Sequence, residues 1–280
     1  MVRIITDSAA DFEPWELEKH NIACIPLTVT FGERSYQENV DLSKDLFYTL
    51  LARSEIFPVT AQASPQVLID LFEEAKTNGD EAIYITLSSA LSGTYQTAKV
   101  SRDLVNCSRC HVLDSRSATG GQRMLVEHAV RLRDEGKNAE EIIAGVSALR
   151  ERIVLYACMD TLENLYKGGR ISRAVYSLGS MAQIKPILRV EPDGGLSIPG
   201  KAIGARKGMD TLCRQLAKHQ SDSAFPLYVM FTDNRGMAET LAQRLRDMGY
   251  GIPDAHIIQV GAAIGTHIGP NACGFVYIEK

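Results

Sequence analysis

A hydroxyl-rich turn between a predicted strand and a predicted helix constrains the fold of this 280-residue chain more than any other feature. The turn is LSSALSG at 87–93, and the apolar run Ala82–Thr86 before it predicts a buried strand. After the turn, the apolar spacing over Thr94–Leu104 predicts a helix. Unpaired backbone N–H groups and the positive dipole end at a helix start favour an anion such as a carboxylate or phosphate. The serines also fit a simpler role as helix caps.

The same order of strand, polar turn and helix recurs elsewhere in the chain. The strand Val2–Ile5 precedes TDSAAD at 6–11, and the strand His111–Leu113 precedes DSRSATGG at 114–121. In an open parallel sheet, ligands bind beyond the carboxyl ends of the strands. We therefore expect these turns to form one polar rim along one edge of a sheet. TAQASP at 60–65 precedes a further predicted helix, with the proline at its first position.

Two domains with different element patterns are predicted. Residues 1–158 alternate strand and helix, which indicates an α/β domain with a mostly parallel sheet covered on both faces. We expect 22–30 to form one strand there and 153–158 to be the last strand. Residues 159–280 contain a predicted hairpin around PDGG at 192–195 together with helices, which indicates a smaller α+β domain.

Composition excludes some classes of protein. The hydrophobic share of 45% and the charged share of 23% are typical of a soluble globular chain. A net charge of −4 gives no reason to expect nucleic acid as a partner. No stretch is long and apolar enough for an integral membrane segment, and the sequence starts with a strand rather than a leader. We therefore expect a cytoplasmic protein.

Among the six cysteines, only Cys107 and Cys110 are close in sequence. They follow a predicted helix end rather than a helix start, where a thiolate would be stabilised. A second ligand pair for zinc is missing from the sequence. We interpret the pair as incidental, with a redox or metal role as the alternative, and the other four as ordinary side chains in a reducing compartment.

The sequence contains no complete copy of the common catalytic and cofactor-binding motifs considered below. GLSIPGKA at 195–202 approaches a phosphate-binding loop, but Ala202 replaces the required hydroxyl and the context is a hairpin. Dinucleotide-binding, nucleophile-elbow and zinc-protease motifs do not occur. The site is thus rich in hydroxyls and poor in bases and metal ligands, which predicts binding rather than catalysis, with no cofactor and no metal.

Several stretches together resemble the DegV family of bacterial fatty-acid-binding proteins. They are TDSAAD at 6–11, TAQASP at 60–65, LSSALSGTYQTA at 87–98, DTLENLYKGGRIS at 160–172, KPIL at 185–188 and THIGP at 266–270. They follow the family's order over essentially the whole chain. Ala61, Ala63 and Asn271 depart from the family's usual Ser, Pro and Gly.

This resemblance implies a DegV-like fold that holds a long-chain fatty acid between its domains. Residues 1–158 would bind the lipid and residues 159–280 would cover the acyl chain. The resemblance implies that Thr60 and Ser92 bind the carboxylate and that His267 lies close to it. Ser89 and Gly93, from the same turn as Ser92, complete the expected ligand site.

The resemblance also implies a partner, a separate ATP-dependent fatty acid kinase that phosphorylates the bound acid. The acyl phosphate would then enter phospholipid synthesis. Arg170 and Arg206 are the candidate residues for docking this kinase. Simpler roles stay open: Arg170 as the neutraliser of a helix end, Thr60 as a helix cap, and His267 as a partner of backbone groups.

Three hypotheses of function follow. The first is a fatty acid carrier that serves a kinase. The second is an acyl- or phosphoryl-group hydrolase or transferase with His267 as its base, which the absence of a nucleophile–base pattern disfavours. The third is a regulatory lipid sensor.

Overall fold

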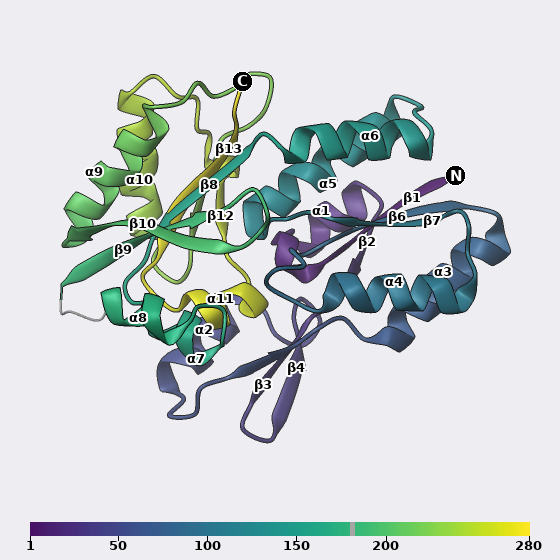
Figure 1. The fold of residues 1–280 in the computed structure, drawn as a ribbon, viewed down its shortest axis with the longest axis horizontal. Coiled ribbons are helices and arrows are strands. Elements are labelled where there is room, and N and C mark those ends of the chain that lie inside the picture. Colours follow the sequence, from purple (N-terminus) through teal and green to yellow (C-terminus); the bar gives the residue numbers. More distant parts are fainter. Residues whose placement is uncertain (180–182) are drawn as a thin grey trace.

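The computed structural model describes residues 1–179 and 183–280. Its strands form three sheets, and helices pack against them (Figure 1). The strands are β1 Val2–Asp7, β2 Ile22–Ile25, β3 Thr28–Phe31, β4 Arg34–Gln37, β5 Val59–Ala61, β6 Glu81–Thr86, β7 Cys110–Asp114, β8 Ile153–Cys158, β9 Ile184–Val190, β10 Leu196–Ile203, β11 Tyr228–Phe231, β12 Ile257–Gln259 and β13 Cys273–Ile278. The helices are α1 Pro14–Lys19, α2 Lys44–Arg53, α3 Pro65–Asn78, α4 Thr94–Val105, α5 Thr119–Asp134, α6 Ala139–Arg150, α7 Glu163–Lys167, α8 Arg173–Gly179, α9 Ala205–Leu216, α10 Arg235–Asp247 and α11 Ala262–Ile268, with the short 3₁₀ helices η1 Ser8–Ala10 and η2 Asp254–His256.

The first sheet is parallel, with the strand order β2-β1-β6-β7. Alternate residues of β6 face opposite sides: Tyr84 packs with α3 and α4, whereas Ile83 and Ile85 pack with α5 and α6. Both faces are therefore buried, as expected for a parallel sheet. This confirms the predicted α/β architecture of the first part of the chain.

The second sheet is mixed, with the strand order β10-β9-β8-β13-β11-β12. Helices α9 and α10 cover one face, and the other face packs toward α5 (Figure 1). Here the structure corrects one prediction, because β8 pairs with β9 and β13 rather than with the parallel sheet. The apolar sequence of β8 is compatible with either sheet, because the partners of a strand are distant from it in sequence. The boundary at 158/159 stays a prediction.

A third, antiparallel sheet has the order β4-β3-β5. The predicted single strand over 22–30 is wrong, because β2 ends before Pro26 and β3 starts at Thr28 in this other sheet. Proline lacks the N–H that a central strand needs. After this break the chain enters the third sheet, in which the edge strand β5 contains Thr60.

Helix α11 at 262–268 was not expected from the sequence and packs against α2. The Tyr48 hydroxyl of α2 donates to the Val260 carbonyl at 2.9 Å. A Cβ at Gly265 would lie 2.6 Å from the Tyr48 hydroxyl, so glycine allows the two helices to meet.

No helix in the described part of the chain is long and apolar enough to cross a membrane.

Candidate functional site

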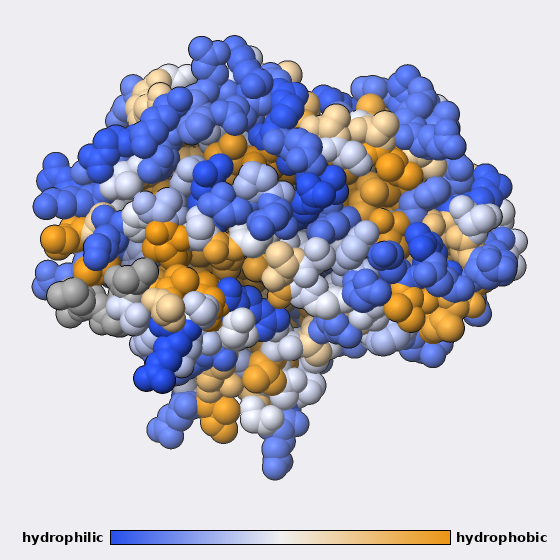
Figure 2. Space-filling model, in the orientation of Figure 1, coloured by the Kyte–Doolittle hydropathy of each residue, from blue (hydrophilic) through white to orange (hydrophobic). Residues whose placement is uncertain are grey.

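A cavity lies where the loops at the carboxyl ends of β6 and β7 face the second sheet. The space between its lining residues that holds no protein atoms is about 930 Å³, with the open solvent at its mouth included. Its walls are mainly apolar and come from loops beside the first sheet and from strands of the second sheet. Leu27, Leu87 and Leu91 contribute from the first part of the chain, and Leu155, Leu188 and Met230 from the second. Figure 2 shows apolar side chains gathered between the β9–β10 hairpin and α8, beside this region.

Polar side chains from several separate segments line the same cavity. Four of them are Thr60, Ser92, Arg170 and His267, and Gln62, Thr119 and Thr232 also line it. Thr60 Oγ1 lies 2.9 Å from His267 Nε2, so these two residues are hydrogen-bonded. The structure therefore brings together three of the predicted ligand-binding residues, and adds Arg170, which was expected to dock a partner.

The His267 ring is neutral at physiological pH. Burial, together with the positive charge of Arg170, lowers its pKa to about 4. Its Nδ1 atom is buried and has no protein partner among the described residues. The ring packs against Gly168, where a Cβ would overlap Nδ1. Neutral imidazole offers one donor and one acceptor, so Nε2 can either donate to Thr60 Oγ1 or accept from it, according to the tautomer.

Ser92 lies just before Gly93, the N-cap of α4, and lines the cavity. Its hydroxyl oxygen accepts a hydrogen bond from the Thr94 N–H at 3.3 Å and lies 3.0 Å from Thr94 Oγ1. Thr94 Oγ1 in turn accepts from the Ala63 N–H at 3.3 Å, which holds the loop after β5 against the start of α4. Because of this link, Thr60 and Ser92 reach the same cavity. The interpretation of the serines as caps of α4 is wrong, because the N-cap is Gly93 and no side chain caps this helix.

The other predicted site residues lie outside the cavity lining. Ser89 is exposed, and its hydroxyl donates to Asp114 Oδ2 at 2.5 Å. Gly93 allows the loop after β5 to approach, since a Cβ there would overlap the Gln62 side chain. Arg206 is exposed on α9. The helix-cap alternative for Thr60 is wrong, because Thr60 lies within β5 opposite Val29.

Arg170 is half-buried and its charge is not neutralised by a described carboxylate. Its Nε donates to the Leu91 carbonyl at 3.1 Å and its Nη1 to the Gly168 carbonyl at 2.6 Å. The second bond reaches the C-terminal end of α7, so the helix-end role also holds. Burial lowers the Arg170 pKa. The cavity is therefore lined by a guanidinium that has no carboxylate partner in the described part of the chain, which suits an anionic ligand.

Two buried carboxyl groups behind α11 were missed from the sequence. Asp11 accepts from the Gly261 N–H at 2.8 Å and Glu38 from the Ala263 N–H at 3.3 Å, so both bind the start of the helix that carries His267. Burial raises the pKa of Asp11 to about 8 and that of Glu38 to about 7. Asp11 belongs to the TDSAAD turn, which was the signal available in the sequence.

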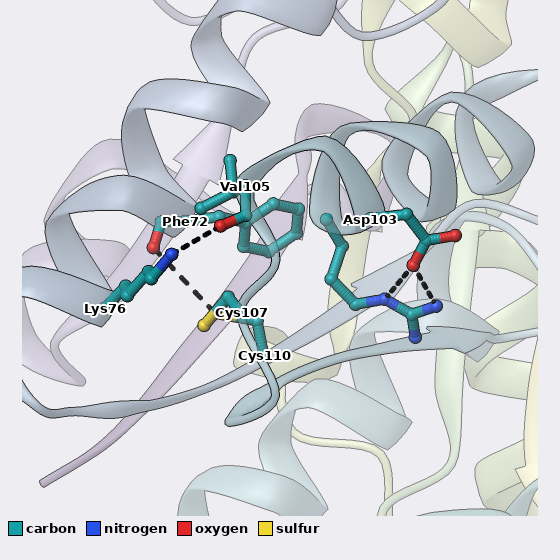
Figure 3. Close-up of a disulfide and its surroundings, with 7 residues drawn as sticks. Phe72, Lys76, Asp103, Val105, Cys107 and Cys110 are labelled. Atoms are coloured by element: carbon teal, nitrogen blue, oxygen red, sulfur yellow. Dashed lines mark hydrogen bonds and ion pairs between the residues drawn. A yellow bond between two sulfur atoms is a disulfide. The ribbon is translucent and has the colours of Figure 1, made fainter.

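The interpretation of Cys107 and Cys110 as incidental is wrong, because the structure joins them in a disulfide (Figure 3). The Cys110 N–H donates to the Cys107 carbonyl at 3.2 Å, and this turn between α4 and β7 brings the two side chains together. Both lie in the core beside Phe72 and do not line the cavity. Among residues 1–179 and 183–280, no three His, Cys, Asp or Glu side chains converge as metal ligands.

This chain resembles known proteins over its whole length. A family model described as "Uncharacterised protein, DegV family" matches residues 1–280. The chain belongs to the DegV family. A DegV domain-containing protein of Caldanaerobacter subterraneus subsp. tengcongensis is 36% identical over all of this chain and 99% of its own length. The predicted family resemblance is therefore confirmed.

Solved DegV structures share the whole fold. The DegV family protein of Thermus thermophilus, described for its fatty acid binding, has a TM-score of 0.90 at 25% identity and covers 100% of this chain and 99% of its own. DegV of Bacillus subtilis, described as a fatty acid binding protein, has a TM-score of 0.85 at 28% identity with the same coverage. In this DegV-family chain, Asn271 adopts φ 55°, a left-handed conformation that explains why asparagine can stand where the family has glycine.

Proposed function

We propose that this DegV-family chain binds a long-chain fatty acid, with its carboxylate at Thr60, Ser92, His267 and Arg170. The observation that carries the proposal is an apolar cavity with this polar group in its lining. Arg170 supplies a positive charge, and the hydroxyls of Thr60 and Ser92 supply hydrogen-bond donors. With its proton on Nε2, His267 donates to Thr60 Oγ1 and leaves the Thr60 hydroxyl proton free for the ligand.

The acyl chain supplies most of the binding energy in this proposal. A long acyl chain has roughly fourteen methylenes, and at ~0.8 kcal/mol each their burial yields on the order of 11 kcal/mol before association costs. A neutral hydrogen bond adds only about 1 kcal/mol. The apolar walls therefore set affinity, whereas the polar group sets orientation and selects an acid over other head groups.

The same proposal includes a role as carrier. The loaded chain presents the carboxylate to a separate ATP-dependent fatty acid kinase, which forms an acyl phosphate for phospholipid synthesis. This step is supported by the resemblance and by the position of Thr60 next to Ala61 and Gln62, which line the cavity and are exposed. The exposed Arg206 stays a candidate for docking the kinase, and Arg170 is reassigned to the ligand.

The enzyme hypothesis has one observation in its favour, the contact between the Thr60 hydroxyl and His267 Nε2. Such a contact resembles a nucleophile and its general base. However, His267 Nδ1 has no described partner that would orient the ring, and a pKa of about 4 makes the ring a weak base. We therefore favour binding over catalysis.

Displacement of a fluorescent fatty acid tests the binding site. Thr60→Ala and Ser92→Ala together are expected to weaken fatty acid binding while leaving the melting temperature close to that of the wild type. Ser89→Ala is the matched control, because it removes a hydroxyl from the same turn outside the cavity. Equal affinity in the double variant and the control would reject the placement of the carboxylate. Turnover of an acyl ester or acyl phosphate by the chain alone would instead support the enzyme hypothesis.

A further inference from the structure

Strand register shows how far the cavity extends over the second sheet. Ala157 of β8 is paired with Leu188 of β9 and with Gly274 of β13, and Gly274 is paired with Met230 of β11. These four residues form one row across the sheet, and all of them line the cavity. The cavity floor therefore crosses the sheet at this row.

The next row along the same face is closed on the β13 side. It runs from Val190 and Leu155 to Val276 and Tyr228, but only Val190 and Leu155 line the cavity. The reason is Gly120 in the first turn of α5, where a Cβ would lie 2.7 Å from Val276 Cγ1 and 3.0 Å from Met230 Sδ. The helix start thus rests directly on the sheet and leaves no space there.

Thr119, next to Gly120, completes this closure. Its hydroxyl donates to Met230 Sδ at 3.0 Å, and both side chains line the cavity while being only 6% and 4% exposed. By contrast, Ala61 and Gln62, which line the cavity beside Thr60, are exposed. The cavity lining therefore includes exposed residues beside Thr60 and the buried pair Thr119 and Met230, where the start of α5 closes the β13 side.

We propose that Thr119 and Met230 form the end wall that sets the longest acyl chain this protein accepts. The inference rests on the proposed function, because the carboxylate bound at Thr60 fixes one end of the ligand. With that end fixed, each added methylene moves the terminal methyl group deeper. Binding improves until the methyl group meets the wall, and a longer chain must then bend or displace closely packed side chains.

Two variants move the wall in different ways. Met230→Ala shortens the side chain at the buried end. Thr119→Gly removes the other half of the wall and suits the backbone, since Thr119 has φ 50°, a conformation that glycine adopts without strain. Met209→Ala is the matched control, because Met209 is equally buried but belongs to the core beneath α9, away from the cavity.

The test measures affinities for an even-numbered series of saturated fatty acids by competition with a fluorescent fatty acid. Affinity is expected to rise about fourfold per methylene up to a break point and to fall beyond it. The break point should move to longer acids in Met230→Ala and Thr119→Gly and stay at the wild-type length in Met209→Ala. Folded variants that keep the wild-type break point would overturn the assignment of the wall. A wild-type protein that binds none of the acids would overturn the proposed function itself.

Discussion

The Thr60 hydroxyl and the His267 imidazole lie 2.9 Å apart although 207 positions separate them in the chain. β5 positions the first and α11 the second, and the loop at 168–170 between α7 and α8 contributes both the glycine that packs on His267 and the guanidinium of Arg170. The polar end of the cavity therefore exists only in the folded chain. Each of its parts can be tested separately.

Arg170→Gln is expected to weaken fatty acid binding about ten- to a hundredfold, because a hydrogen bond to a charged group contributes ~1.5–3 kcal/mol. The corresponding fatty alcohol lacks the carboxylate, so its affinity should change little. Parallel competition assays with the acid and the alcohol measure both. A loss that is equal for the two ligands would show that Arg170 acts on packing rather than on charge.

Gly168→Ala should displace the His267 ring, since the new methyl group would overlap Nδ1. We expect weaker fatty acid binding and a His267 pKa above about 4, because a displaced ring is less buried. NMR titration of the ring follows the pKa directly. Gly236→Ala, in the exposed first turn of α10, is the control and should change neither quantity. An unchanged pKa in Gly168→Ala would contradict the packing described for the ring.

The two carboxyls behind α11 predict a pH dependence of stability. In the folded state the pKa of Asp11 is raised from 3.8 to about 8 and that of Glu38 from 4.5 to about 7. A raised pKa means that the folded state binds more protons, so this contribution is complete below about pH 4 and is lost as the pH rises to about 8. Asp11→Asn and Glu38→Gln imitate the protonated forms.

The measurement is the difference in melting temperature between each variant and the wild type at several pH values. This difference removes the contribution of other groups, such as His267, that titrate in the same range. Each variant should gain stability over the wild type as the pH rises from about 4 to about 8. A difference that is constant with pH would show that these carboxyls do not titrate as described.

The disulfide between Cys107 and Cys110 predicts how many free thiols the protein has and predicts that the bond affects stability but not fatty acid binding. Alkylation of the unfolded, unreduced protein should modify only Cys24, Cys158, Cys213 and Cys273, and mass spectrometry measures the number of labels. Serine at both positions should lower stability by less than ~3 kcal/mol, because the closed loop is short. Fatty acid affinity should not change, since neither residue lines the cavity. Labelling of all six positions without reduction would contradict the bond.

Local signals in the sequence predicted much of the fold. Pro65 begins α3, as its position after TAQAS predicted. The hairpin of β9 and β10 follows from its glycine-rich turn. Strand partners such as those of β8 could not be predicted, because pairing depends on contacts between distant segments.

The candidate site shows the same limit. Thr60, Ser92 and His267 were named through the resemblance, and the structure places them in one cavity. Arg170 was expected to dock a partner or to neutralise a helix end, because a basic residue after a helix fits either role, and its proposed role at the ligand was not foreseen. Its orientation depends on the Leu91 carbonyl, which the fold brings close from another segment. Cavity shape and depth depend on packing between sheets and carry no sequence signal.

Mass spectrometry of the lipids extracted from the purified protein tests the central claim most directly. The account predicts one long-chain fatty acid per chain, retained through purification, and its depletion in the double variant of Thr60 and Ser92. An empty protein that also fails to take up added fatty acid would contradict the account and return the Thr60–His267 contact to the enzyme hypothesis.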